Sequence, residues 1–524
     1  MSTLLRGGQV HSRAVRGATA LLVEGDVVAW LGTEDGADQL SATETVQLDG
    51  AWVAPAFVDA HVHATATGLA LTGLDLSGAT SLADALDALA AHAAARPGDA
   101  VLLGTGWDEA GWPERRAPTA IELDRATGGR ATYLARADLH SAVANAALGG
   151  AGLVRLDEHH AVRARALASV GPAQTRDAQR ATRARAAALG VGCLHEMGGP
   201  EVSSADDLAG LLTLAAEEGG PEVLAWWGEL GGHATAAALG AQPGGDLFLD
   251  GSLGSHTAAL SQPYRDLGAD DEAPCGVLRH DLEAITAHVV AATRAGQQAG
   301  FHAIGDAALD TVLRAMERAA EQLGLAAVVH ARHRLEHAEL LDSGLIARCA
   351  RLGAVASVQP AFDARWAEGM YVDRLGAARA ARTNPFAALV AAGVPLALGS
   401  DAPVTPLDPW GALRAATRPA ADPAHALSGR AAFAAHTRGG WRAARLDGGE
   451  LAPGSDATFA VWQTAGELVV VAPDSRVAGW STDPRSGTPG LPALHTPDGP
   501  APDPLCLRTV VRGRTIHQLE GAPA

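Results

Sequence analysis

Two hydrophobic patterns alternate along the middle of the chain. Short apolar runs that end in a polar residue are followed by longer Ala- and Leu-rich stretches with helical spacing. This alternation predicts βα units built around a parallel sheet. Eight candidate strands can be placed, at residues 57–64, 191–197, 222–228, 246–251, 299–305, 333–339, 354–360 and 395–401. Eight such units are typical of a (β/α)8 TIM barrel, here in a distorted form, which makes the predicted fold class α/β.

Polar side chains close most of these eight runs. In a (β/α)8 barrel the reactive side chains lie at the carboxyl ends of the strands. The residues in that position are His61, His63, Glu196, Asp250, His302, His337, Gln359 and Asp401. We therefore expect these side chains to meet at one mouth of the barrel.

Both ends of the chain are rich in β-strand patterns. Residues 1–50 form short alternating runs broken by turns, and similar runs recur at 457–463, 467–472 and 508–516. We predict that residues 1–54 and 447–524 pack together as one small β-sandwich. The barrel then occupies residues 55–446.

Residues 65–185 are too long for a single crossover between the first two barrel strands. Within them, residues 100–107 and 131–138 have the apolar character of further strands. We expect an inserted subdomain over the barrel mouth. Near the C-terminus, the proline-rich stretch 484–504 predicts a surface loop.

Composition narrows the range of partners. The formal net charge is −19, which argues against non-specific binding to nucleic acid or to acidic membranes. The four cysteines form no CxxC pair, so a disulfide framework or a thiolate zinc site is not expected. No apolar run approaches a membrane span or a signal peptide core. We expect a soluble cytoplasmic protein, by default a homodimer, that acts on a small molecule.

Two histidines give the first indication of chemistry. His61 and His63 project from the same face of an extended strand and can hold one divalent ion, although two surface histidines would have the same spacing. His302, His337 and Asp401 each end a later predicted strand. Four histidines and one aspartate at the same end of one barrel predict a metal site.

Nine sequence stretches then carry a family resemblance that spans nearly the whole chain. Through them the sequence resembles the amidohydrolase superfamily, and more closely amidohydrolase family 3, which is related to N-substituted formamide deformylases. The stretches are FVDAHVH (57–63), GWDEAGWP (106–113), LHSAVANAAL (139–148), LDGSLGSHTAAL (249–260), FHAIGDAAL (301–309), RHRLEHAELL (332–341), SVQPAF (357–362), LGSDAPV (398–404) and LAPGSDATFAVW (451–462).

The resemblance implies metal-dependent hydrolysis of a C–N bond by activated water. The implied ligands are His61, His63, His302 and Asp401, and zinc is the expected ion because the ligands are nitrogen and oxygen. Asp401 also has the chemistry to carry a proton from water to the leaving amine. His337 either ligates a second ion or donates a hydrogen bond to the substrate carbonyl.

One departure from the family pattern bears on the number of ions. Where related sequences commonly carry a lysine that is carboxylated and bridges two metals, this chain has Asp246, and it contains no lysine at all. Asp246 and Glu196 remain possible bridging carboxylates or barrel-mouth hydrogen-bonding groups. Because aspartate is several bonds shorter than a carboxylated lysine, the sequence predicts one tightly held ion per chain.

Other family motifs supply candidate pocket residues. His256 stands where the family pattern usually has arginine, and an imidazole cannot form the bidentate guanidinium contact. Trp107, His140 and Gln359 are candidate substrate-binding residues, and Trp107 fits core packing equally well. Asp250 and the Gly-rich residues 251–255 are expected to form a loop over the site.

Three functions remain open at this stage. The favoured one is hydrolysis of an amide, including an N-acyl or N-formyl amine. The second is deamination of a heterocyclic amine, which would release ammonia rather than a carboxylate. The third is a non-catalytic barrel that acts in assembly, but such a protein would be expected to have lost metal ligands.

Overall fold

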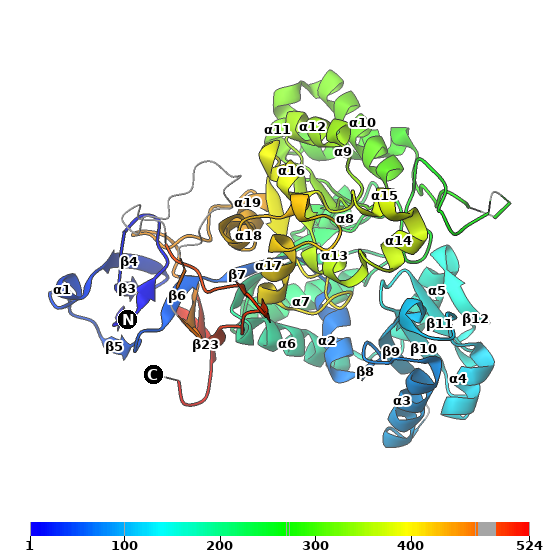
Figure 1. The fold of residues 1–524 in the computed structure, drawn as a ribbon, viewed down its shortest axis with the longest axis horizontal. Helices are drawn as coiled ribbons and strands as arrows, with labels where there is room; N and C mark the ends of the chain where they lie inside the picture. The colour runs from blue at the N-terminus through cyan, green and yellow to red at the C-terminus, as the bar shows by residue number, and fades with distance from the viewer. Residues whose placement is uncertain are drawn as a thin grey trace.

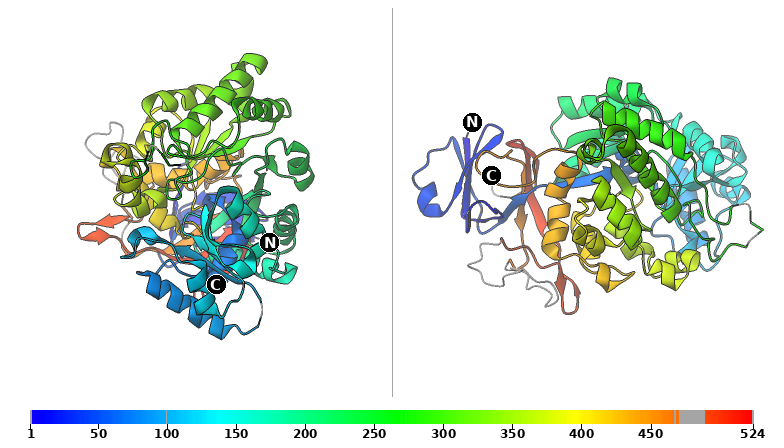
Figure 2. Two further views of the ribbon diagram at one scale, coloured as in Figure 1. Left: turned by 90° about the vertical axis from the view of Figure 1, so that its right-hand side faces the viewer. Right: turned by 90° about the horizontal axis from the view of Figure 1, so that it is seen from above.

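The computed structural model describes residues 2–98, 100–268, 270–271, 273–466, 468–469 and 489–522, although not the side chains of 156–160. A small β-rich part lies at one end of the molecule, and a larger α/β part with an additional sheet occupies the rest (Figure 1). Both chain termini lie in the small β-rich part (Figure 2). None of the helices in the described residues combines the length and the apolar character needed to cross a membrane.

The larger part is built on two parallel four-stranded sheets with the orders β15-β14-β13-β7 and β16-β17-β18-β19. Their strands are β7 (Phe57–Val62), β13 (Val191–Gly198), β14 (Glu222–Trp227), β15 (Gln242–Pro243), β16 (Gly300–Ala303), β17 (Arg334–His337), β18 (Val355–Val358) and β19 (Leu396–Leu398). Seven of these coincide with predicted strands. Neighbouring strands within each sheet run parallel, as expected of strands joined by crossover connections rather than by hairpins.

Backbone hydrogen bonds join the two sheets into a ring. Asp401 N donates to His61 O at 2.8 Å, which connects β7 to the residues that follow β19. On the other side, His302 N donates to Leu247 O and Leu249 N donates to His302 O. The ring of eight strands makes the fold a distorted (β/α)8 TIM barrel.

The fourth strand differs from the prediction. The regular pairing of β15 covers only 242–243, and the predicted run 246–251 contributes one isolated bridge between Phe248 and His302. Gly244 and Gly245 separate the two pieces, with φ of +142° and +79°. A Cβ on Gly244 would lie 2.0 Å from Gly300 N, so the backbone crosses β16 at a distance that only glycine permits.

Helices cover the outside of the barrel (Figure 1). In α10 (Asp306–Leu323), Leu309, Val312 and Met316 follow helical spacing and are fully buried, which explains why this segment folds as an amphipathic helix on the barrel. The other helices of this layer and of the mouth are α2 (Ala64–Thr72), α6 (Pro172–Ala188), α7 (Ala205–Glu217), α8 (His233–Leu239), α9 (Leu282–Arg294), α11 (Leu325–Ala331), α12 (Ser343–Leu352), α13 (Pro360–Trp366), α14 (Met370–Leu375), α15 (Ala377–Ala380), α16 (Phe386–Ala391), α17 (Pro409–Thr417), α18 (Gly429–Ala435) and α19 (Arg438–Ala443).

Residues between β7 and β13 form the additional sheet, with the order β12-β11-β10-β9-β8. It contains β8 (Leu74–Asp75), β9 (Leu102–Trp107), β10 (Thr132–Arg136), β11 (Ser141–Ala144) and β12 (Gly152–Arg155), together with α3 (Leu82–Ala95), α4 (Ala120–Thr127) and α5 (Leu156–Leu167). Strands β9 and β10 are the two runs predicted at 100–107 and 131–138. The sheet therefore spans residues 74–155, and α6 returns the chain to the barrel.

The two chain ends meet in one five-stranded sheet with the order β2-β6-β20-β23-β24. A second sheet, β4-β3-β1-β5, shares an apolar core with it that includes Leu21, Val53, Phe459 and Val510. The elements are β1 (Ser2–Arg6), β2 (Gln9–Val10), β3 (Ala20–Glu24), β4 (Val27–Gly32), α1 (Glu34–Ala37), β5 (Glu44–Gln47), β6 (Trp52–Pro55), β20 (Phe459–Gln463), β23 (Leu505–Val511) and β24 (Arg514–Gln518).

Two predictions near the C-terminus fall partly outside the described residues. Of the predicted strand 467–472, only residues 468 and 469 are described. Of the predicted loop 484–504, residues 484–488 lie outside the described part. The remainder contains a short hairpin of β21 (His495–Thr496) and β22 (Gly499–Pro500).

Candidate metal centre

Six buried side chains converge at the carboxyl ends of the barrel strands. They are His61 and His63 at the end of β7, Asp246 after β15, His302 in β16, His337 at the end of β17 and Asp401 after β19. His337 and Asp401 adopt φ of +69° and +53°, a strained conformation for residues other than glycine. Such strain is concentrated at functional sites, where the surrounding fold holds it in place.

The six side chains form three overlapping groups with metal-ligand geometry. The groups are His61–His63–Asp246, His61–His337–Asp401 and Asp246–His302–His337. Within each group, the candidate ligand atoms lie within 4.8 Å of one another. The groups share members, so the cluster is one continuous site rather than three separate ones.

Asp246 occupies the centre of this cluster. Its Oδ2 lies 3.4 Å from His63 Nε2, and its Oδ1 lies 3.1 Å from His302 Nδ1 and 3.4 Å from His337 Nε2. The distance to His61 Nε2 is 3.7 Å. The two oxygens of one carboxylate thus face histidines from opposite sides of the barrel mouth.

The donor atoms fit a divalent cation. His61 Nε2 and Asp401 Oδ1 are buried atoms without a hydrogen-bond partner in the described part of the chain, and they lie 3.4 Å apart. A cation between them would satisfy both atoms, and imidazole nitrogen with carboxylate oxygen is a donor set typical of zinc and related ions.

Hydrogen bonds on the far side of each ring orient the histidines. His61 Nδ1 lies 3.0 Å from Glu336 Oε2, His63 Nδ1 lies 3.0 Å from Met197 O, and His337 Nδ1 lies 2.9 Å from Gln359 Oε1. In His302 the roles of the nitrogens are reversed, because Nε2 lies 3.2 Å from Gly251 O and Nδ1 faces Asp246. Such contacts orient the inward nitrogen of each ring so that it can ligate a metal ion.

The electrostatics of the cluster favour added positive charge. Burial alone would lower the pKa of His63, but hydrogen bonds and charge from Asp246 and Asp401 outweigh it and raise the pKa to about 9. In His61 the same two carboxylates outweigh burial and hold the pKa well above its usual value. Two negative carboxylates among four rings therefore bind either protons or metal cations.

The structure groups the expected ligands differently from the prediction. The sequence placed His302 on the same ion as His61, His63 and Asp401, whereas the structure groups it with Asp246 and His337. Glu196 stays outside all three groups, and its Oε2 accepts a hydrogen bond from Ala64 N at 2.8 Å. Burial raises the pKa of Glu196 to about 7.

The other candidate residues have varied surroundings. His140 lies beside His302, with ring centroids 5.0 Å apart, and lines a small cavity over the cluster. Gln359 orients His337. Trp107 is fully buried within the additional sheet and donates to Leu134 O at 2.8 Å, so it is core packing rather than a substrate contact. His256 pairs with Asp266 at 3.0 Å.

Asp250 acts as a structural clamp on the loop over the site. Its carboxylate accepts backbone hydrogen bonds from Ala259, Ile304 and Gly305, at 2.8–3.1 Å. These bonds fix the residues after β15 against the end of β16. The expected loop over the site is therefore held in place by hydrogen bonds to the barrel.

Two supporting groups were missed in the sequence. Glu336 is fully buried between His61 and Arg334, and Arg334 Nη2 donates to Ala60 O at 2.7 Å. Both residues lie in the RHRLEHAELL stretch. Two opposite charges within one predicted barrel strand could have identified them from the sequence. The second group is Arg163 of α5, which donates to Glu201 O at 2.7 Å.

A cavity of about 380 Å³ adjoins the cluster beside His63 and Glu196. Arg163 lines it together with the apolar side chains of Leu69, Leu167 and Val202. A much smaller space, of about 20 Å³, lies directly over His302, His337 and Asp401, between the additional sheet and α13. The cluster of six side chains thus has little open space above it and a cavity large enough for a small molecule beside it.

Comparisons with known proteins agree with this geometry. The Amidohydrolase family model matches residues 44–517. The putative amidohydrolase YtcJ of Bacillus subtilis (strain 168) is 29% identical over 458 residues, covering 78% of this chain and 82% of that protein. A shorter match, 31% identical over 134 residues and about a quarter of each chain, is to the N-substituted formamide deformylase of Arthrobacter pascens.

A solved structure matches the fold over most of its length. It is an uncharacterized metal-dependent hydrolase from Pyrococcus horikoshii OT3, with a TM-score of 0.71 and 25% identity, covering 88% of this chain and 97% of the other. The family match covers far more than half of the chain, and the six-residue cluster supplies the expected ligand chemistry. The chain therefore belongs to the amidohydrolase family and is a metal-dependent hydrolase.

Proposed function

We propose that this hydrolase cleaves the C–N bond of a small-molecule amide, of the N-acyl or N-formyl amine class, at a centre of two zinc ions bridged by Asp246. The position of Asp246 carries the proposal, because its two oxygens face His63 on one side and His302 and His337 on the other. His61, His63 and Asp401 would hold one ion, and His302 and His337 the other.

This proposal departs from the single ion expected from the sequence. That expectation rested on the short side chain of aspartate. In the structure, the short Asp246 side chain nevertheless reaches both groups of histidines, with His63 3.4 Å from Oδ2 and His302 3.1 Å from Oδ1. His337 then serves as a ligand, since Gln359 holds its Nδ1 and turns Nε2 toward Asp246.

The chain's own residues can move the protons of the reaction. Divalent ions supply a water of lowered pKa and polarise the substrate carbonyl. Asp401 Oδ1 lies 3.4 Å from His61 Nε2 and 3.1 Å from His63 Nε2, so its carboxylate is within reach of a water held beside these ligands. The water oxygen bonds to the carbonyl carbon, Asp401 takes the water proton, and it returns that proton to the amine nitrogen as the C–N bond breaks.

The cavity beside His63 supports a small-molecule substrate. Its volume of about 380 Å³ and its mixture of apolar side chains with Arg163 are typical of a ligand site. The tight space over the metal cluster would exclude bulk water from the reacting atoms.

Two measurements test the proposal. Elemental analysis of the purified enzyme should give close to two ions per chain, and a panel of N-acyl and N-formyl amines should release the carboxylate. Asp246→Ala should reduce the metal content, while Gln359→Ala should retain both ions with weaker activity. One ion per chain would refute the bridge, and ammonia release without a carboxylate product would refute the amide substrate.

A further inference from the structure

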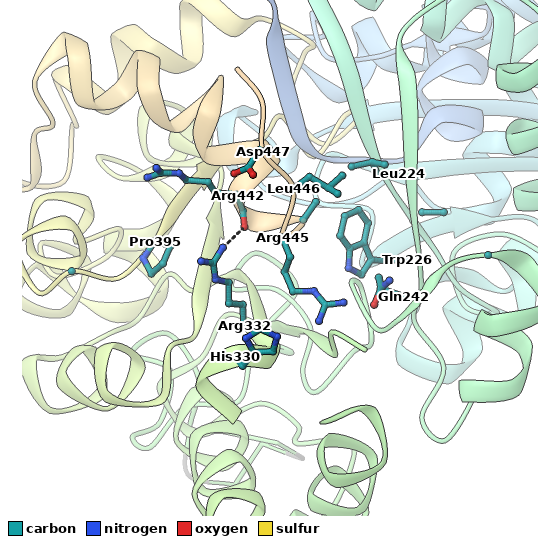
Figure 3. A pocket seen from close by; sticks show the side chains of 14 residues that line it. Leu224, Trp226, Gln242, His330, Arg332, Pro395, Arg442, Arg445, Leu446 and Asp447 are labelled. Atoms are coloured by element: carbon teal, nitrogen blue, oxygen red, sulfur yellow. Dashed lines mark hydrogen bonds between the residues drawn. The ribbon is translucent and has the colours of Figure 1, made fainter. Parts of the chain in front are cut away.

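A large cavity lies at the opposite end of the barrel from the metal centre. Its volume is about 980 Å³, and it is lined by residues of β14, by residues at the amino-terminal ends of β15, β17 and β19, and by the segment after α19. Figure 3 shows Arg332 and Arg445 extending from different elements, Arg332 toward Arg442 and Arg445 toward Trp226 and Gln242. The metal-dependent reaction has no use for this site.

The cavity gathers positive charge in a strongly acidic chain. Arg332, Arg442, Arg445 and His330 line it, whereas Asp447 is its single acidic lining residue. Arg332 and Arg442 are exposed and Arg445 is half-buried. Within the described ranges, none of the three cavity arginines has a carboxylate within 4.0 Å.

Backbone contacts hold two of these guanidinium groups in place. Arg332 Nη1 donates to Arg442 O at 3.3 Å, and Arg445 Nη1 donates to Gly296 O at 2.8 Å. Each bond uses one nitrogen and leaves the remaining N–H groups of the fork for a ligand. Burial lowers the pKa of Arg445, and the positive charge of Arg332 lowers it further, so the two charges are near enough to repel each other.

The backbone at both arginines is strained. Arg332 ends α11 with φ of +49°, and Arg445 has φ of +62°. Glycine is the favoured residue in this left-handed conformation. The chain instead places a cationic side chain at both positions, and strain of this kind points to function.

A further donor lies in the wall of the same cavity. Trp226 is 1% exposed and lines the cavity, and its Nε1 is a buried atom without a hydrogen-bond partner among the described residues. Gln242 lies beside it, and its Oε1 accepts a hydrogen bond from Gln298 N at 2.9 Å. The lining therefore offers donors and positive charge but few acceptors.

We propose that this cavity binds a phosphate-bearing small molecule, with the Arg332 and Arg445 forks on the phosphate oxygens. Guanidinium forks match phosphate in a bidentate geometry, and Trp226 Nε1 with the Gln242 amide supplies further donors for the rest of the molecule. The ligand bridges the loop before β17 and the segment after α19. Its binding therefore stabilises the amino-terminal end of the barrel.

The test uses the metal-loaded enzyme with inorganic phosphate and with a sugar bisphosphate. Thermal unfolding in each is compared with chloride at equal ionic strength, and the affinity is measured by calorimetry. The test variant is Arg332→Gly/Arg445→Gly, which removes the charges while relieving the backbone strain, so it is expected to fold. We expect phosphate to raise the melting temperature of the natural protein, and the variant to bind at least tenfold more weakly.

Matched controls separate this site from others. Arg314→Ala/Arg318→Ala removes two exposed charges from α10 and should leave phosphate binding unchanged. Arg332→Lys/Arg445→Lys keeps the charge without the fork and should bind with intermediate affinity. The proposal is overturned if phosphate acts no differently from chloride, or if the Gly variant binds as tightly as the natural protein, which would place the phosphate at the metal centre instead.

Discussion

Gly300→Ala tests how the fold delivers Asp246 to the metal centre. A Cβ on residue 300 would lie 2.4 Å from Gly245 N, whereas ordinary contact begins at 3.4 Å, so the segment carrying Asp246 must move by about 1 Å. Gly300 has no left-handed φ, so the clash alone is tested. Metal ligands tolerate errors of only about 0.2 Å, and a misplacement of about 1 Å can cost about 10²-fold in rate.

The expected result separates the site from general stability. Overpacking should lower the free energy of unfolding by about 1–3 kcal/mol, measured by denaturant titration. Metal content should fall toward one ion per chain, and kcat should fall about 10²-fold. The matched control is Gly210→Ala in α7, where a Cβ meets nothing within 4 Å and should stabilise the helix by about 1 kcal/mol. A Gly300→Ala enzyme with two ions and unchanged kcat would refute the reasoning.

Further predictions concern the proton carrier, the metal and the chain ends. Asp401→Asn should keep the fold and lose about 10²–10⁴-fold in kcat, and turnover within a few-fold of the natural enzyme would argue against Asp401 as the proton carrier. Prolonged chelation should abolish activity, and readdition of zinc should restore it. Full activity in metal-free protein would contradict the metal-dependent mechanism. Because the pKa of His63 is raised to about 9 without an ion, a proton must leave when the metal binds, so metal affinity should rise with pH up to about 9. A competition titration with a flat pH profile would contradict this. Deleting residues 505–524 removes β23 and β24 and exposes Phe459, so the melting temperature should fall; unchanged melting would show that these strands add no stability.

The barrel could be predicted because each strand is a short apolar run that ends in a polar residue. Seven predicted strands match, since burial on both faces requires uninterrupted apolar residues, as in Val355–Val358. The fourth failed because its course depends on Gly244 and Gly245 passing Gly300. That contact joins residues far apart in the sequence, so no local sequence pattern predicts it.

The candidate site shows the same division between local and long-range information. His61, His63, His302, His337 and Asp401 could be named because each ends a predicted strand. Their grouping could not be predicted, because it depends on ring orientations set by Glu336, Gln359 and the Met197 carbonyl. Trp107 was ambiguous because its motif gives no indication of which face it occupies; its indole in fact lies in the core of the additional sheet.

The arrangement of the five-stranded sheet also sets an order of events during synthesis. Strand β6, which leads directly into β7 and the metal-binding histidines, lies between β2 and β20, and β20 in turn pairs with β23. Strand β20 begins at Phe459, about 400 residues after β6 ends at Pro55, so β6 has only one of its two neighbours until that stretch has been synthesised. An unpaired strand edge is a site of intermolecular association. The nascent barrel must therefore be protected at this edge, and C-terminally truncated products of translation should aggregate or be degraded rather than accumulate as partial enzymes.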